Sequence, residues 1–214
     1  SGFEIANMIG AGLAKAAIAV SVNGIQKDLC DPINEDSEVS IITVDSDEGL
    51  EIMRHTLTAQ VLARAVKNIY PDAKLAIGPT IKDGFYYDFE FVESIAPDDL
   101  VKIEKEMLKI INSKSSITKK LHSKKDALNV FNSIGESYKE SIIDESEQED
   151  NFQLYYQEND EFVDLCRGPH LPSLKHIGAF KLTKLAGAYW KGDSKNKMLT
   201  RIYGTAWKNE KDLN

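Results

Sequence analysis

The sequence predicts an α+β protein in which a small first unit is followed by a larger domain. Stretches with the three- and four-residue spacing of helices are interspersed with stretches that alternate like strands. Asn23-Gly24 and Lys82-Asp83-Gly84 are short turns that join neighbouring strands and so favour antiparallel pairing. A chain of 214 residues that is 42% hydrophobic can form one good-sized core, or one domain plus a small satellite. We expect residues 1–44 to form the small unit and residues 45–214 the larger domain, with a mostly antiparallel sheet and packed helices.

The first 44 residues are predicted to form one helix and three short strands. Apolar residues between positions 3 and 13 fall roughly on one side of a helix. Residues 17–22 alternate as a strand, and Asn23-Gly24 then tolerates the positive φ of a two-residue hairpin turn. Residues 38–44 supply a further alternating strand. This is little material for independent stability, so we expect the unit to pack against its neighbour or to lack an edge.

A long amphipathic helix is predicted next, from an N-cap among residues 45–47 to a stop at Pro71. Its apolar residues recur at three- and four-residue steps, which gives the helix a buried stripe. The stripe consists of Leu50, Met53, Leu57, Val61 and Ala65.

Further strands and helices follow in mixed order. Residues 75–91 are predicted as two strands across the 82–84 turn, and residues 97–114 as an amphipathic helix. Residues 123–136 are predicted as another helix, which Gly135 ends as a left-handed C-cap. The remainder alternates strands and turns, with strands expected at residues 152–157, at 161–166 and around 179–190.

Charge is strongly segregated along the chain. The net charge of -8 argues against a general nucleic-acid binder, and residues 140–164 hold ten acidic and no basic residues. Residues 171–208 reverse this with eight basic residues and one acid, a balance of +7, interleaved with aromatic rings. Such a stretch suits a phosphate backbone and unpaired bases, although it equally suits a solvated basic face whose rings belong to the core.

Features of a secreted or membrane protein do not stand out. No run of about 18 apolar residues occurs, and the start lacks the basic-then-apolar pattern of a secretory signal. Cys30 and Cys166 lie far apart in unlike contexts, which favours reduced thiols over a disulfide framework. We therefore expect a cytoplasmic protein that does not engage a membrane.

Chemically rich residues cluster in four stretches. They are His55 on the long helix and residues 84–88, 135–139 and 164–170. The last stretch, DLCRGPH, packs a carboxylate, a thiol, a guanidinium and an imidazole into seven residues across a Gly-Pro turn. That density is unusual for a purely structural strand end and indicates an active or binding site. His122 and His176 lack polar company and are expected to be structural.

Five sequence blocks together resemble a known family. EIMRH, LAIGPTIKDGFYYDFE, GESYK, VDLCRGPHLPS and FKLTKLAGAYWKGDSKNKMLTRIYGTAW follow the order seen in the amino-terminal editing domain of bacterial threonyl-tRNA synthetase. The first 44 residues resemble its TGS domain, a β-grasp unit, without the opening hairpin. No stretch resembles the class II catalytic core, to which ATP and zinc would belong.

The resemblance implies that the chain hydrolyses seryl-tRNA specific for threonine. The partner is then a mischarged tRNA whose 3′ end enters the site. No cofactor is expected for this reaction, and no metal. We expect the fragment to be monomeric, although the parent enzyme dimerises through its catalytic core.

Site residues carry over from the family by motif. Lys139, Asp164, His170 and Tyr87 match their counterparts in GESYK, DLCRGPH and GFYYD. We expect Lys139 to bind and activate water or to steady the oxyanion, and His170 and His55 to handle protons and ribose hydroxyls.

The remaining site residues are expected to contact the aminoacyl group. Asp164 is expected to hold the substrate amine, while Cys166 and Tyr87 line the small pocket. Gly78 is expected to let the backbone approach the serine side chain. Arg167 and Gln60 are further substrate-binding candidates.

Two other functions stay open. His55, Cys166 and His170 are suitable zinc ligands, so a zinc-dependent deacylase like the related alanyl-tRNA synthetase editing domain is one alternative. A non-catalytic tRNA-binding module that uses residues 171–208 is the other.

The long helix departs from the family at one point. The family has His-x-x-x-His on one helix face, whereas here one extra residue separates His55 from the position that Gln60 occupies. An added residue in a helix is often absorbed as a π-bulge. We predict such a bulge at residues 55–60, which returns Gln60 to the face of His55.

Overall fold

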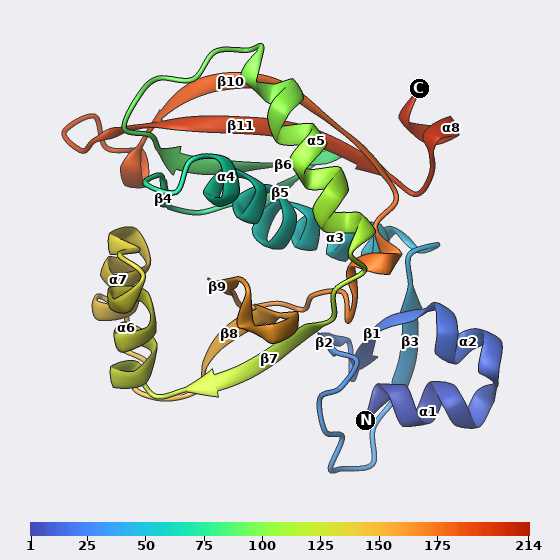
Figure 1. Ribbon diagram of the computed structural model, residues 1–214. Coiled ribbons are helices and arrows are strands. Elements are labelled where there is room, and N and C mark those ends of the chain that lie inside the picture. The colour runs from blue at the N-terminus through green and yellow to red at the C-terminus, as the bar shows by residue number, and fades with distance from the viewer.

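The computed structural model describes all 214 residues, and it confirms the predicted α+β class (Figure 1). A small antiparallel sheet near the N-terminus has the strand order β2-β1-β3, with two short helices beside it. Asn23 and Gly24 have φ values of 51° and 80°, which confirms the hairpin turn between β1 and β2. The elements of this unit are α1 (Gly2–Ile9), α2 (Ala11–Ala16), β1 (Ala17–Val22), β2 (Ile25–Asp28) and β3 (Val39–Thr43).

The small unit packs against the larger one, as its size predicts. Ile18 and Ala19 of β1 and Ile42 of β3 belong to the same 26-residue hydrophobic cluster as the centre of the larger domain. Burying these side chains stabilises both units at once, because each apolar surface is removed from water by the other. The predicted boundary after residue 44 falls between β3 and the next helix, and as a division into separate domains it stays a prediction.

The long helix is continuous but changes its winding in the middle. It runs through α3 (Asp47–Thr56), the π-helical segment η1 (Leu57–Leu62) and α4 (Ala63–Ile69), and the Ser46 side chain caps its start by accepting from the Gly49 N–H. All six residues of η1 are buried. The predicted wide turn is therefore confirmed, two residues later than expected.

The larger domain is built around an antiparallel sheet in the order β10-β11-β6-β4, with β5 paired to β6. The helices α3, α4 and α5 (Asp99–Asn112) lie against one face of this sheet (Figure 1). Phe85, Tyr87 and Phe89 of β6 are fully buried in the main cluster. The strands are β4 (Lys74–Leu75), β5 (Thr80–Ile81), β6 (Gly84–Glu90), β10 (Ala179–Tyr189) and β11 (Met198–Trp207).

A third sheet in the order β7-β8-β9 carries two helices on one side (Figure 1). Gly135, with a φ of 71°, follows the first of them as predicted. The second begins at Ser137, where the sequence pattern predicts only the GESYK motif and no helix. These elements are β7 (Ile117–His122), α6 (Lys124–Ser133), α7 (Ser137–Asp144), β8 (Phe152–Gln157) and β9 (Val163–Leu165).

Short helical turns and a terminal helix complete the fold. They are the 3-10 turns η2 (Glu158–Asp160), η3 (Leu174–His176) and η4 (Trp190–Gly192) and the helix α8 (Glu210–Leu213). None of the helices combines the length and apolar composition that crossing a bilayer requires.

Candidate functional site

A buried ion pair joins two of the predicted site residues. The Lys139 Nζ of α7 lies 2.8 Å from the Asp164 Oδ1 of β9, and the two side chains are only 4% and 1% exposed. The Tyr87 hydroxyl donates to Asp164 Oδ2 at 2.9 Å, and the Leu165 N–H donates to Oδ1 at 2.8 Å. Both oxygens of Asp164 are thus already bonded within the protein. The carboxylate fixes where the ammonium group of Lys139 lies.

Next to this pair, His55, Cys166 and His170 form a compact cluster. The His55 Nε2 lies 2.6 Å from the Cys166 Sγ, and the two imidazoles are stacked with centroids 4.5 Å apart and planes within 9°. The ring of Tyr155 meets His170 edge-on, at 4.4 Å between centroids. Residues from a helix, a strand end and a loop far apart in the sequence therefore converge, as the motifs predicted.

Burial sets the protonation of this cluster. It lowers the pKa of His170 well below the ordinary value, with the neighbouring His55 adding to the effect, and burial likewise lowers the pKa of His55. Burial raises the pKa of the Cys166 thiol to about 12. At neutral pH the site accordingly contains two neutral imidazoles and a protonated thiol.

The tautomer of His170 follows from its hydrogen bonds. The Leu171 N–H donates to Thr56 Oγ1 at 3.0 Å, and this hydroxyl lies 2.9 Å from His170 Nδ1. We assign the ring proton to Nε2, because Thr56 Oγ1 already accepts from the Leu171 N–H and its hydroxyl can then donate to Nδ1. That Nε2 is buried and has no partner in the protein. His170 thus has one ring nitrogen that no protein group occupies.

This protonation state predicts acid sensitivity. In the unfolded chain the two histidines take up protons with an ordinary pKa of 6.5, whereas in the fold they stay neutral to lower pH. The unfolded state therefore binds more protons below this pH, and the free energy of unfolding falls as the pH drops. We expect the urea midpoint to be highest above the ordinary pKa and to decline below it. The decline should be shallower in His170→Gln, and equal slopes in both proteins would contradict the assignment.

An open cleft leads to the ion pair and the thiol. It has a volume of about 530 Å³, within the range of small-molecule pockets, and Lys139, Cys166 and Arg167 line it. Glu145, directly after α7, and Lys191 of η4 also line it and form an ion pair with each other. His170 instead borders a second cavity of about 140 Å³ on the side of the small unit.

Tyr87 and Gly78 lie behind the cleft and do not line it. Tyr87 is 1% exposed and holds Asp164, so it supports the ion pair. A Cβ atom on Gly78 would lie 2.2 Å from the Tyr87 ring and 2.9 Å from the Tyr86 carbonyl oxygen. Only glycine therefore fits at position 78, because any side chain there would clash with the Tyr87 ring. The predicted contact of its backbone with a substrate stays a prediction.

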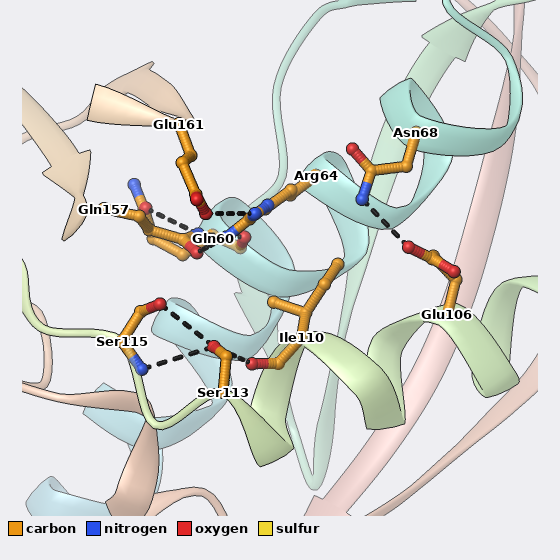
Figure 2. Close-up of polar contacts among 9 residues, drawn as sticks. All are labelled: Gln60, Arg64, Asn68, Glu106, Ile110, Ser113, Ser115, Gln157 and Glu161. Carbon is orange, nitrogen blue, oxygen red and sulfur yellow. Dashed lines mark hydrogen bonds and ion pairs between the residues drawn. The ribbon is translucent and has the colours of Figure 1, made fainter. Parts of the chain in front are cut away.

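Gln60 is buried on the π-helical segment (Figure 2). It is 0% exposed, and its amide donates to the Tyr155 carbonyl at 3.4 Å and accepts from the Gln157 amide at 3.2 Å. The adjacent Arg64 donates to Gln157 at 2.7 Å and to Glu161 at 2.6 Å, which closes this region. A substrate would reach the Gln60 amide only after these bonds broke, so its predicted contact with substrate stays a prediction.

Some residues that build the site were missed by sequence reasoning. Thr56, Tyr155 and Asp28 all contact His170, and none belongs to a recognisable motif. The one available signal was the position of Thr56 directly after His55. Asp28 and Tyr155 lie in strands remote from the motifs, and only the fold brings them in.

The basic stretch at residues 171–208 is largely neutralised by acids from elsewhere in the fold. Five of its eight cations form ion pairs, and Arg201 also lies over the Tyr86 ring at 3.8 Å. Trp190 packs on Tyr138, and Trp207 lies under Arg54. The stretch therefore presents much less positive charge than its +7 balance predicts. The five pairs are Lys181–Glu104, Lys191–Glu145, Lys197–Glu90, Arg201–Asp88 and Lys208–Asp45.

By donor type and spacing, His55, Cys166 and His170 are a candidate metal site, with one ligand atom from each within 4.8 Å of the others. Their orientation does not fit tetrahedral zinc. An imidazole binds a metal in its own plane, so an ion in the plane of one stacked ring lies several ångströms outside the plane of the other. Nε2 and Sγ, 2.6 Å apart, are also closer together than two tetrahedral zinc ligands at about 2.0 and 2.3 Å from a common ion, which lie about 3.5 Å apart.

Comparisons with known proteins agree with this fold. Residues 153–203 match a family model described as the threonyl and alanyl tRNA synthetase second additional domain, and residues 2–43 match the TGS domain. Threonine–tRNA ligases from two strains of Acidithiobacillus ferrooxidans are each 49% identical to the chain over 213 residues, covering 100% of it and 33% of the relative. One from Hahella chejuensis is 50% identical over 210 residues, covering 98% and 32%. The chain spans about a third of the length of these relatives.

A TGS-type unit joined to the second additional domain of threonyl and alanyl tRNA synthetases defines an editing-associated region of an aminoacyl-tRNA synthetase. Relatives align with the whole chain, so the region is assigned to one kind of synthetase. The chain belongs to the threonyl-tRNA synthetase family, as its amino-terminal TGS plus editing-associated region.

Proposed function

We propose that this chain hydrolyses the ester of seryl-tRNA specific for threonine and so removes a mischarged product. The single observation that carries the proposal is the buried Lys139–Asp164 pair, which meets the thiol of Cys166 at an open cleft. A buried ammonium held in a fixed place is what a developing oxyanion needs. A protein that only binds tRNA has no evident need for this combination.

Serine and threonine differ by one methyl group, which explains why a second site is needed. A missing methyl group in a pocket gives only about 1–3 kcal/mol of discrimination, or roughly 10–200-fold. A hydrolytic site that accepts the smaller amino acid supplies the remaining selectivity. The partner is then a tRNA, and the expected compartment is the cytoplasm, where tRNAs are charged.

In the proposed reaction, water attacks the carbonyl carbon of the ester. The water oxygen bonds to that carbon, the bond from the carbon to the ribose oxygen breaks, and the ribose oxygen receives a proton. Lys139 donates hydrogen bonds to the water or to the oxyanion. Asp164, whose two oxygens are bonded to Lys139, Tyr87 and the Leu165 N–H, positions the ammonium group.

The two imidazoles complete the proposed site. The free N–H of His170 donates to a ribose hydroxyl or to the ester oxygen, since it has no partner in the protein. His55 is neutral, so we assign it as the group that accepts the proton of the water. Cys166 and Arg167, which line the cleft, contact the aminoacyl group and the terminal nucleotide.

The proposal is tested by incubating the chain with seryl-tRNA and measuring ester loss against the uncatalysed rate. We expect hydrolysis that is unchanged after treatment with a chelator. No acceleration over the uncatalysed rate would reject the proposed function.

A zinc-dependent deacylase is the second candidate, favoured by the donor set of His55, Cys166 and His170. It requires the stacked rings to reorient, since they do not fit tetrahedral zinc as they lie. Metal analysis of the purified protein separates the two candidates. One bound zinc per chain, together with activity lost on chelation, would favour the zinc enzyme.

A further inference from the structure

Asp28 of β2 extends from the small unit into the candidate site. Its side chain is buried, the residue being 6% exposed, although it belongs to a different sheet from every predicted site residue. Its Oδ1 accepts from the backbone N–H of His170 at 2.9 Å, and its Oδ2 accepts from the Tyr155 hydroxyl at 2.6 Å. Lys119 Nζ lies 3.0 Å from Oδ2 and balances the charge.

These bonds hold His170 in two ways. The bond to the backbone N–H fixes the loop that carries the imidazole, and the bond to Tyr155 fixes the ring that packs edge-on against it. The loop is tightly enclosed here, since a Cβ atom on Gly168 would lie 2.0 Å from the Tyr155 hydroxyl oxygen. Thr56 holds the imidazole from the other side. The place of the free N–H of His170 is therefore set jointly by Asp28 and Thr56.

We propose that Asp28 is a positioning residue for hydrolysis, so that the small unit forms part of the hydrolytic site. The inference rests on the proposed function for its effect on rate and on the contacts alone for its effect on His170. Bonds to a charged acceptor are stronger than bonds between neutral groups, which suits a residue that must hold a loop in one place. A misplacement of about 1 Å can cost roughly 100-fold in rate.

A matched control lies three residues further along. Asp31 also pairs with Lys119, at 2.5 Å, and its Oδ2 accepts from the Asp28 N–H at 3.1 Å. It contacts neither Tyr155 nor His170. Asp31→Asn thus disturbs the same ion-pair network without removing a direct contact to the site.

The rate test compares Asp28→Ala, Asp28→Asn and Asp31→Asn in hydrolysis of seryl-tRNA. We expect a fall in kcat of roughly 100-fold for Asp28→Ala and a smaller fall for Asp28→Asn, whose amide oxygen still accepts from the His170 N–H. KM should change little, because Asp28 does not line the main cleft. Asp31→Asn should stay close to the parent. A folded Asp28→Ala with unchanged kcat, or a change in KM alone, would overturn the proposal.

A second measurement does not depend on activity. Amide hydrogen exchange of the segment 166–171 should be faster in both Asp28 variants and unchanged in Asp31→Asn. Unchanged exchange in the Asp28 variants would overturn the positioning role. If Asp28→Ala does not fold, Asp28→Asn and Tyr155→Phe, which removes the hydroxyl that Asp28 accepts from, carry both tests. If the parent protein does not hydrolyse seryl-tRNA, the proposed function fails, while the exchange result still decides whether Asp28 fixes His170.

Discussion

Replacing Lys139 with alanine is expected to lower kcat for hydrolysis of seryl-tRNA by about 10²–10³-fold, the usual effect of removing one donor to an oxyanion. The ammonium is the cation that Asp164 and Tyr87 hold at the base of the cleft. Binding of tRNA should persist, because Lys139 is buried and would supply only one of the many contacts that a bound tRNA makes. The measurement is single-turnover loss of serine, together with tRNA binding by filter retention.

The same substitution also leaves Asp164 as an unpaired buried charge, which destabilises proteins by about 3–5 kcal/mol. A double variant, Lys139→Met with Asp164→Leu, removes both charges and should regain most of this stability without regaining hydrolysis. Lys102→Ala, which loses only an exposed pair with Asp99 on α5, is the control for a lysine outside the site and should be near neutral. Hydrolysis within threefold of the parent in the folded double variant would remove Lys139 from the mechanism.

Replacing His170 with alanine is expected to lower kcat by roughly 10²–10⁴-fold, the usual range for a group that transfers or positions a proton. The substitution removes the one buried N–H in the cluster that has no partner in the protein. Stability should fall as well, because the imidazole packs against both Tyr155 and His55.

His122→Ala is the matched control for this variant. His122 lies on β7 and contacts the Tyr156 hydroxyl at 3.2 Å, away from the cluster. We expect its hydrolysis rate to stay near that of the parent. If His122→Ala and His170→Ala lose activity equally, the proposed role of His170 is wrong.

The motif residues of the site could be found from the sequence because short peptides carry them. Asp164, Cys166 and His170 are close together in one stretch, so a turn is enough to bring them to one place. The π-helical segment could be predicted too, since one extra residue in an otherwise regular helix has few ways to be absorbed.

The supporting contacts could not be found in this way. Asp28 lies 142 positions from His170 in the sequence, and its importance arises only from how β2 packs against the loop after β9. The ion pairs of the basic stretch could not be predicted either, because the acidic partners lie in four other segments of the chain. Local patterns predict which residues have reactive chemistry, whereas the packing of distant elements decides which of them are held, neutralised or left free.

The most direct test of the proposed function is incubation of this chain with matched seryl- and threonyl-tRNA that share the same tRNA body. We expect fast loss of serine and retention of threonine, because a proofreading site must spare the correct product. Equal rates for the two esters, or no loss of either, would contradict the account.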